Sequence, residues 1–327
     1  MSRRICIFVS LLAVSLSAFS QESRHFAFHY TFTIKNLPEG KKIRVWIPAA
    51  HSDAFQEVKV LSAKGDLPLK KTHESQYGND MYFAETPKSA QQELHFDVEY
   101  DVVRHERIAL EPSARVVAAA LTKKERQEDL QPYALVPITG RPAELAAKVT
   151  EGKTDALSKA RAIYDYVFST MRYDKTGTGW GRGDVLYACD AKKGNCTDFH
   201  SLFIAMARSQ GIPARFEIGF PLPPNKHSAE IAGYHCWSDF YVDGKGWIPV
   251  DISEAWQHPE KRNYFFGSHD ADRVQFTMGR DLELSPRQDG KPLNYFVYPY
   301  VEVEGKEYPN ISVAFSFADQ GASVAMR

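Results

Sequence analysis

Alternating apolar and polar residues dominate the first third of the chain. An apolar side chain stands at every second position from Phe26 to Ile34, and the same period of two returns at Ile43–Ile47 and at Leu94–Val102. Since successive side chains of a strand point to opposite faces, this pattern predicts strands with one buried face. Helical periodicity is absent up to about Leu110, so residues 21–112 are predicted to form an all-β sandwich.

The period changes after residues 113–140, a segment of mixed charge, rich in proline towards its end, which we interpret as a linker. A short helix is predicted from Pro142 to Thr150. A longer helix is predicted after Asp155, because apolar residues from Leu157 to Met171 recur at spacings of three and four. A glycine-rich loop, Gly177–Gly183, follows and lacks the Lys-Ser/Thr end of a phosphate-binding loop, which argues against nucleotide binding.

A third helix is predicted to begin at Cys196, with Asn195 as its N-cap and Asp198 in its first turn, where negative charge is favoured. Two strands then read as a hairpin, Tyr234–Val242 and Trp247–Ile252, joined by a glycine-containing turn. We place a core at residues 141–300 and a C-terminal β segment at residues 301–327, where alternation resumes.

The first 20 residues have the form of a signal peptide. A short basic stretch precedes an apolar run, Ile5–Leu16, and small residues lie at positions −3 and −1 of a cleavage site before Gln21. The run is shorter than the roughly 20 apolar residues of a membrane span. We therefore expect an exported protein, periplasmic or secreted, without a membrane span.

Composition excludes some classes of partner. The formal net charge is −1 and basic runs are absent, which argues against binding to nucleic acid. Removal of residues 1–20 leaves three cysteines, Cys189, Cys196 and Cys236. An odd number in an exported protein indicates a free, reactive thiol. A Cys189–Cys236 disulfide would leave Cys196 as that thiol, and two buried reduced thiols are the alternative.

Cys196 is the candidate nucleophile, because a thiol at a helix N-terminus ionises more readily. A thiolate mechanism also needs a histidine and a group that orients it. His235 and Asp251 lie on adjoining strands of the predicted hairpin and suit these roles. His200, one turn after Cys196, is a rival base, and an inert buried thiol or a metal site of Cys196, His200 and His235 are further alternatives.

Two segments resemble the transglutaminase-like superfamily. The segment Gly194–Phe203, followed by Gly211-Ile212-Pro213-Ala214-Arg215, is similar to its nucleophile helix. His235-Cys236-Trp237 and Gly246–Asp251 are similar to its histidine and aspartate strands, in the same Cys, His, Asp order. The resemblance covers about Ala156–Gly279, and the region around Val45–Pro48 is similar to the β domain that often precedes this core.

The resemblance implies an α+β fold, in which an all-β, Ig-like sandwich precedes a papain-like core. It implies catalysis by Cys196, His235 and Asp251 through a thioester, without cofactor or metal. The oxyanion would be bound by the Cys196 backbone N–H and an upstream donor, for which we expect Trp180.

Three functions remain open. We expect a cysteine protease or amidase that hydrolyses peptide or isopeptide amides in a peptide, protein or cell-wall peptide. A transglutaminase that transfers the acyl group to an amine is the alternative, although calcium-binding loops are not evident. A catalytically idle binding module is the third, and retention of all three residues argues against it.

Overall fold

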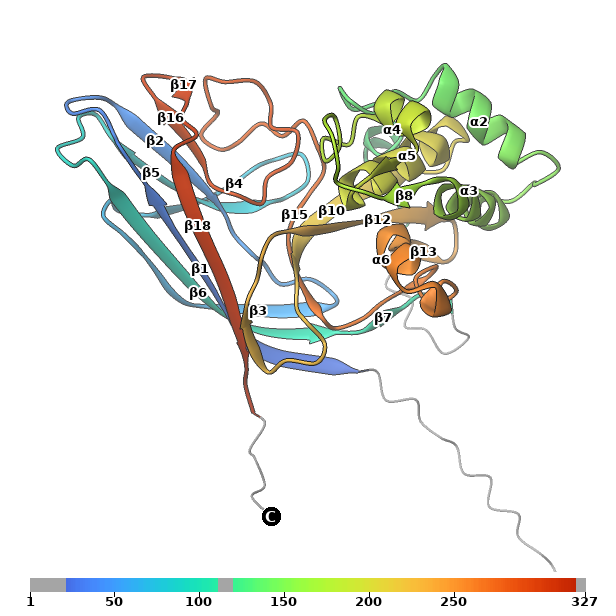
Figure 1. Cartoon of the computed structure of the whole chain (residues 1–327), viewed down its shortest axis with the longest axis horizontal. Coiled ribbons are helices and arrows are strands. Elements are labelled where there is room, and N and C mark those ends of the chain that lie inside the picture. The colour runs from blue at the N-terminus through green and yellow to red at the C-terminus, as the bar shows by residue number, and fades with distance from the viewer. Residues whose placement is uncertain (1–21, 111–119, 322–327) are drawn as a thin grey trace, which may run out of the picture.

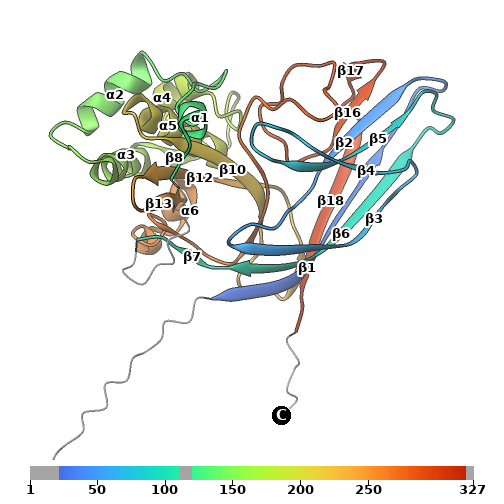
Figure 2. The same cartoon turned by 180° about the vertical axis from the view of Figure 1, so that it is seen from behind.

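The computed structural model describes residues 22–110 and 120–321, and the predicted signal peptide lies outside them. Two antiparallel sheets and a mixed helix–sheet region make up the described chain (Figure 1). The order along the chain, strands first and helices after about residue 122, confirms the predicted α+β class. Figure 2 shows from behind that the helices gather at one end of the molecule.

Each of the two antiparallel sheets has five strands. The first runs in the order β11 (Ser228–Glu230), β18 (Ile311–Asp319), β1 (Ser23–Ile34), β6 (Leu94–His105) and β3 (Gln56–Gly65). The second runs in the order β17 (Lys306–Glu307), β16 (Tyr300–Val303), β2 (Ile43–Pro48), β5 (Asp80–Thr86) and β4 (Lys70–His73). The alternation seen in the sequence is the burial pattern of β1 and β6, in which every second side chain is buried.

The rest of the chain packs helices on a four-stranded sheet. That sheet runs β13 (Gly246–Val250), β12 (His235–Val242), β10 (Ala214–Pro221) and β15 (Arg273–Met278). Its helices are α1 (Lys123–Glu128), α2 (Arg141–Val149), α3 (Ala156–Thr170), α4 (Val185–Ala191), α5 (Cys196–Ser209), α6 (Ile252–Gln257) and the 3-10 turn η1 (Pro259–Lys261). Two short pairs complete it, β7 (Arg107–Ile108) with β14 (Ser268–His269) and β8 (Arg172–Tyr173) with β9 (Lys193–Gly194).

The last strands of the chain complete the first two sheets. β18 pairs with β1 from Phe26 opposite Asp319 to Ile34 opposite Ile311. β16 pairs with β2 in the other sheet. Figure 1 shows β18 beside β1 although they are nearly 300 residues apart in the chain. The sequence predicts residues 301–327 as a separate C-terminal β segment. As far as residue 321, this segment instead belongs to the N-terminal sheets.

A continuous aromatic core joins the sheets to the helical region. Phe220 of β10 lies 5.3 Å from Phe28 and 4.3 Å from Phe315 between ring centroids. Phe276 of β15 lies 5.5 Å from Phe28 and 6.0 Å from Tyr30. All five side chains are buried. Strands of the four-stranded sheet therefore contribute to the core of the β region, and the two parts share one hydrophobic interior.

Two local features differ from the pattern in the sequence. The segment interpreted as a linker contains α1, and Thr122 and Glu125 form a capping box at the N-terminus of this helix. The hairpin strand predicted to reach Ile252 ends at Val250, because Asp251 caps α6 instead. The Asp251 side chain accepts a hydrogen bond from the Glu254 N–H at 3.1 Å, which satisfies a donor of the first helical turn.

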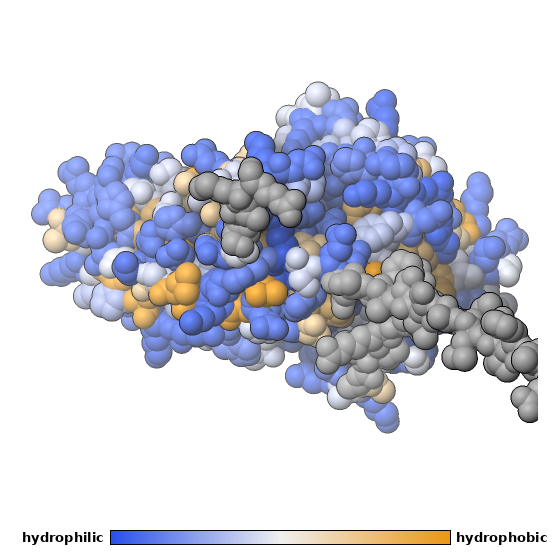
Figure 3. Space-filling model, turned by 90° about the horizontal axis from the view of Figure 1, so that it is seen from below, coloured by the Kyte–Doolittle hydropathy of each residue, from blue (hydrophilic) through white to orange (hydrophobic). Residues whose placement is uncertain are grey.

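The surface is mostly hydrophilic on the face seen from below, where hydrophobic residues form small separate patches (Figure 3). None of the described helices has the length and apolar character needed to cross a membrane.

Candidate active site

Cys196 is the first residue of α5, the helix that packs against β12 and β10. Asn195 caps this helix by accepting a hydrogen bond from the Thr197 N–H at 2.9 Å, and its own N–H donates to the Asp198 carboxylate at 3.0 Å. These bonds hold the first turn in place around the thiol. The Cys196 side chain is buried, at 2% exposed.

Asp198 ties the glycine-rich loop to the start of α5. Its carboxylate accepts hydrogen bonds from the Gly181 N–H at 2.6 Å and the Gly183 N–H at 3.0 Å, besides the one from Asn195. A Cβ at Gly183 would lie 2.4 Å from the Ser201 hydroxyl, and one at Gly194 would lie 2.1 Å from the Asp198 carboxylate. Glycine at these two positions is therefore required for the loop and helix to approach this closely.

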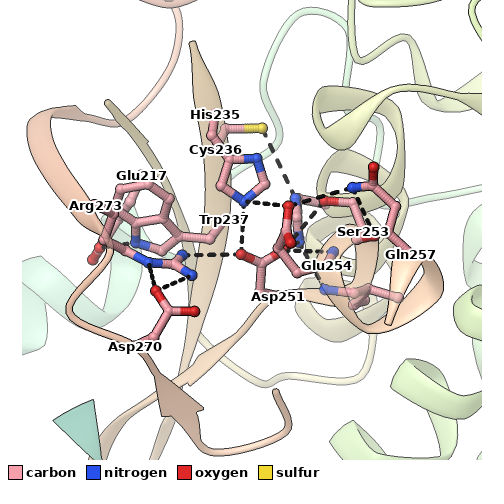
Figure 4. Close-up of polar contacts among 12 residues, drawn as sticks. Glu217, His235, Cys236, Trp237, Asp251, Ser253, Glu254, Gln257, Asp270 and Arg273 are labelled. Carbon is pink, nitrogen blue, oxygen red and sulfur yellow. Dashed lines mark hydrogen bonds and ion pairs between the residues drawn. The ribbon is translucent and has the colours of Figure 1, made fainter. Parts of the chain in front are cut away.

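His235 and Asp251 form a buried hydrogen-bonded pair. His235 begins β12, and its Nε2 lies 2.7 Å from Asp251 Oδ2 (Figure 4). Arg273 of β15 donates to the same oxygen at 2.9 Å. Burial would raise the pKa of Asp251, but the positive charge of His235 and that of Arg273 hold this pKa well below its usual value. The carboxylate therefore stays ionised and orients the imidazole.

The imidazole of His235 also acts on the thiol of Cys196. Hydrogen bonding and charge couple the ionisation of His235 and Cys196, as they couple His235 and Asp251. Burial would lower the pKa of His235, but the charge and hydrogen bond of Asp251 outweigh burial and raise this pKa well above its usual value. Burial would raise the pKa of Cys196, but hydrogen bonds from Cys236 and His235 and the charge of His235 hold it well below its usual value. This arrangement favours a thiolate–imidazolium pair.

His200 is placed differently from His235. It is fully buried on α5, and its Nε2 accepts a hydrogen bond from the Ile252 N–H at 3.0 Å. Burial lowers the pKa of His200 to about 4, against the opposing charge of Asp251. An imidazole held neutral, with one nitrogen occupied by a backbone N–H, is poorly suited to take the thiol proton.

The three described cysteines are free thiols. Cys236, the residue after His235 on β12, is fully buried and faces the start of α5. Its sulfur lies 3.7 Å from the Thr197 hydroxyl and 3.8 Å from His200 Nδ1. Cys189 lies on α4, and burial raises the pKa of its thiol to about 11. The Cys189–Cys236 disulfide is absent from this arrangement.

A cleft of about 370 Å³ opens beside Cys196. The end of β8 and the glycine-rich loop line one part of it, and residues just before β12 and just before β16 line another. Tyr234 donates or accepts at 2.9 Å with the Thr197 hydroxyl and accepts from Asn195 at 3.0 Å. The aromatic lining consists of Tyr173, Trp180, Tyr234, Tyr295 and Tyr298.

Two side chains in the cleft, the Trp180 indole and the Tyr173 hydroxyl, could donate a hydrogen bond to a substrate oxygen. They differ in whether that donor is already bound within the protein. The Trp180 indole N–H donates to the Gly177 carbonyl at 3.1 Å, so in this geometry it is not free to bind a substrate oxygen. Within the described chain, the Tyr173 hydroxyl has no hydrogen-bond partner. Burial and the negative charge of Cys196 raise the pKa of Tyr173, which keeps its hydroxyl protonated.

Several of these residues were missed in the sequence. In the sequence, Tyr173 is only an apolar position after a predicted helix, and nothing marks it as part of a site. Arg273 lies on a strand whose neighbouring strands cannot be predicted from the sequence. The alternative metal site also finds no support, since the described residues hold no group of three or more His, Cys, Asp or Glu arranged to bind a metal.

Comparison with known proteins identifies the region that contains this site. Residues 143–252 match the family model of the transglutaminase-like superfamily. An uncharacterized protein of Haemophilus influenzae is 28% identical over 315 residues, which cover 82% of this chain and 83% of that protein. The uncharacterized protein YebA of Bacillus subtilis is 26% identical over 129 residues, which cover 35% of this chain and 18% of YebA.

The fold is also shared with a solved structure. The crystal structure of a candidate cysteine protease from Cytophaga hutchinsonii matches with a TM-score of 0.60 at 16% identity and covers 93% of each chain. The family match spans the helix of Cys196 and the strands up to Asp251. Residues 143–252 of this chain therefore form a transglutaminase-like core.

Proposed function

We propose that this protein is an exported cysteine hydrolase that cleaves peptide or isopeptide amides through a thioester, and that its core is papain-like. The buried contact of Cys196, His235 and Asp251 at the start of α5 is the observation that carries the proposal. Export rests on the signal-peptide pattern of residues 1–20.

The proposed reaction has two halves. The Cys196 thiolate attacks the carbonyl carbon of the amide, and the imidazolium of His235 gives its proton to the departing amine, which leaves a thioester. His235, now neutral, takes a proton from a water molecule that attacks the thioester. The carboxylic acid product leaves, and the proton returns the pair to thiolate and imidazolium. Asp251 keeps the imidazole oriented in both halves.

The tetrahedral intermediate needs donors for its oxyanion. The backbone N–H of Cys196 lies at the open end of α5, where helical N–H groups lack partners within the helix. We assign the second donor to the Tyr173 hydroxyl in place of Trp180, because Tyr173 lines the cleft beside Cys196 with its hydroxyl unpaired in the described chain.

Replacement of the nucleophile tests the proposal. Cys196→Ala is expected to lower amide hydrolysis by several orders of magnitude, as loss of a triad nucleophile does. Cys189→Ala is the matched control, since Cys189 is also a buried free thiol but lies on α4. Intact mass of the wild type during turnover should show an acyl adduct that the Cys196 variant lacks. Retained turnover in that variant would refute the proposal.

An added amine distinguishes hydrolysis from transfer. If product forms as a new amide in proportion to amine concentration, the protein is a transglutaminase; if acid alone forms, it is a hydrolase. The open cleft offers both water and an amine a path to Cys196, so this measurement decides between them.

A further inference from the structure

The charged residues that line the cleft are both cationic. Lys175 and Arg182 belong to the lining, and no Asp or Glu does so among the described residues. The cleft beside the thiol is therefore electropositive although the whole chain has a formal net charge of −1. A cleft lined by one sign of charge attracts a substrate of the other sign.

Neither cation is neutralised within the described chain. Lys175 Nζ lies 5.4 Å from the centroid of the Tyr173 ring, a contact that keeps its charge at the cleft. Asp174, the adjacent carboxylate, is already engaged, because it accepts hydrogen bonds from the Thr176 N–H at 2.8 Å and from Lys193 at 3.4 Å. Lys175 and Arg182 form no ion pair there.

The backbone that carries Arg182 is held firmly against the nucleophile helix. Its two neighbours, Gly181 and Gly183, donate to Asp198 in the first turn of α5. Its carbonyl accepts hydrogen bonds from Arg280 at 2.9 Å and from Asn294 at 2.8 Å. The exposed guanidinium thus extends from a backbone whose position relative to Cys196 is set by four hydrogen bonds.

From this arrangement we infer that the acyl donor carries a carboxylate within about one residue of the attacked carbonyl, bound by Lys175 and Arg182. The substrate class is an acidic peptide, and the carboxylate is either the side chain of a neighbouring Glu or Asp or the free α-carboxylate of a γ-linked glutamyl amide. Arginine and lysine recognise a carboxylate by charge-assisted hydrogen bonds. The inference rests on the proposed function and narrows it.

Alkylation of Cys196 tests the electropositive cleft without any substrate. Iodoacetate is anionic and iodoacetamide is neutral, so the ratio of their rates reports the charge that a small acyl-like reagent meets at the thiol. We expect this ratio to fall by up to about fivefold in Lys175→Gln or Arg182→Gln and by about tenfold in the double variant. Lys148→Gln, an exposed lysine on α2, should leave the ratio unchanged. An unchanged ratio in the double variant overturns the inference.

Paired substrates test the donor. A peptide with Glu beside the scissile amide, its Gln counterpart and a γ-glutamyl amide should be compared by kcat/KM in wild type and double variant. The wild type should prefer at least one carboxylate donor about tenfold over the Gln peptide, and the double variant should lose that preference; which donor wins identifies the source of the carboxylate. Equal turnover of all three overturns the inference but leaves the hydrolase intact. Absence of any acyl adduct on Cys196 overturns the proposed function, and this inference with it.

Discussion

At the scale of single residues, the two histidines near Cys196 have opposite environments. His235 is paired with an ionised carboxylate, which raises its pKa, whereas burial lowers the pKa of His200 to about 4. Well above pH 4, His235 is the one of these two histidines that contributes positive charge beside the thiol. The structure thereby distinguishes the two histidines that the sequence left open as candidate bases.

Alkylation over a range of pH should show this difference. The depressed pKa of Cys196 means that its thiolate persists below the usual thiol range and is lost only as the pH falls through this low value. Iodoacetamide should therefore react at mildly acidic pH in the wild type. His235→Ala should move the midpoint of the rate profile up towards about 8.5, and His200→Ala should not. A larger shift from His200→Ala would make His200 the base.

Tyr173 offers a second test at this scale. Tyr173→Phe removes the hydroxyl and keeps the ring, which packs 6.2 Å from Phe199 between centroids. Loss of one oxyanion donor should lower kcat by about 100-fold with little change in KM or in thermal stability. Trp180→Phe should lower kcat far less, since its N–H is bound to Gly177. The reverse order of effects would return the oxyanion role to Trp180.

At this scale, the placement of a side chain could be predicted from the sequence where it depends on that residue's own helix or strand. Cys196 begins a capped helix, as its neighbours Asn195 and Asp198 predict. The sequence predicts less about a side chain whose role depends on a contact with a distant part of the chain. Asp251 is held by Arg273, from a strand that reaches it only through the sheet order, and the Trp180 N–H is taken by a carbonyl three residues away, which spacing does not reveal.

At the scale of elements, the glycine-rich loop and α5 act as one unit because three backbone N–H groups meet on the Asp198 carboxylate. The sequence marked Asp198 only as favourable charge at a helix N-terminus. In the sequence, the glycines of this loop raise the question of a phosphate-binding loop, which its residues argue against. In the structure, Gly183 is needed because a Cβ there would collide with the Ser201 hydroxyl of α5. The loop brings Trp180 and Arg182 to the cleft.

Asp198→Asn should loosen this unit. The amide nitrogen that replaces one oxygen cannot accept the hydrogen bonds that this oxygen receives, so at least one buried N–H loses its partner. We expect a loss of about 1–3 kcal/mol in the free energy of unfolding together with a fall in kcat. Asp184→Asn is the control, because Asp184 caps α4 with one oxygen and asparagine caps equally well. Urea unfolding and steady-state kinetics measure both effects, and equal stability of the two variants would contradict this account.

At the scale of the whole molecule, the aromatic core around Phe220 joins the β sheets to the helical region. Alternation predicted β1, β6 and β18 as strands with one buried face, but a period of two carries no information about partners. The pairing of β18 with β1, and the entry of β10 and β15 into the same core, are properties of the folded chain alone. The β region and the helical region consequently share one hydrophobic interior.

A shared core predicts that the two parts unfold together. Phe220→Ala should lower the free energy of unfolding by about 3–5 kcal/mol, as large-to-small changes at buried aromatic positions do. Far-UV circular dichroism and tryptophan fluorescence should give coincident urea transitions, since Trp46 and Trp237 report from different parts. Val60→Ala, at an exposed position of β3, should change little. Two separate transitions would show that the parts are independent.

The pairing of the last strand with the first also sets an order in time. A chain made from its N-terminus cannot close the first sheet between β11 and β1 until residues 311–319 have left the ribosome, nor the second until residues 300–307 have done so. Synthesis must therefore reach residue 319 before both sheets are complete. In the export that we propose, a chain that has not yet reached residue 319 lacks its closed sheets, and an unfolded polypeptide is what a narrow translocation channel admits.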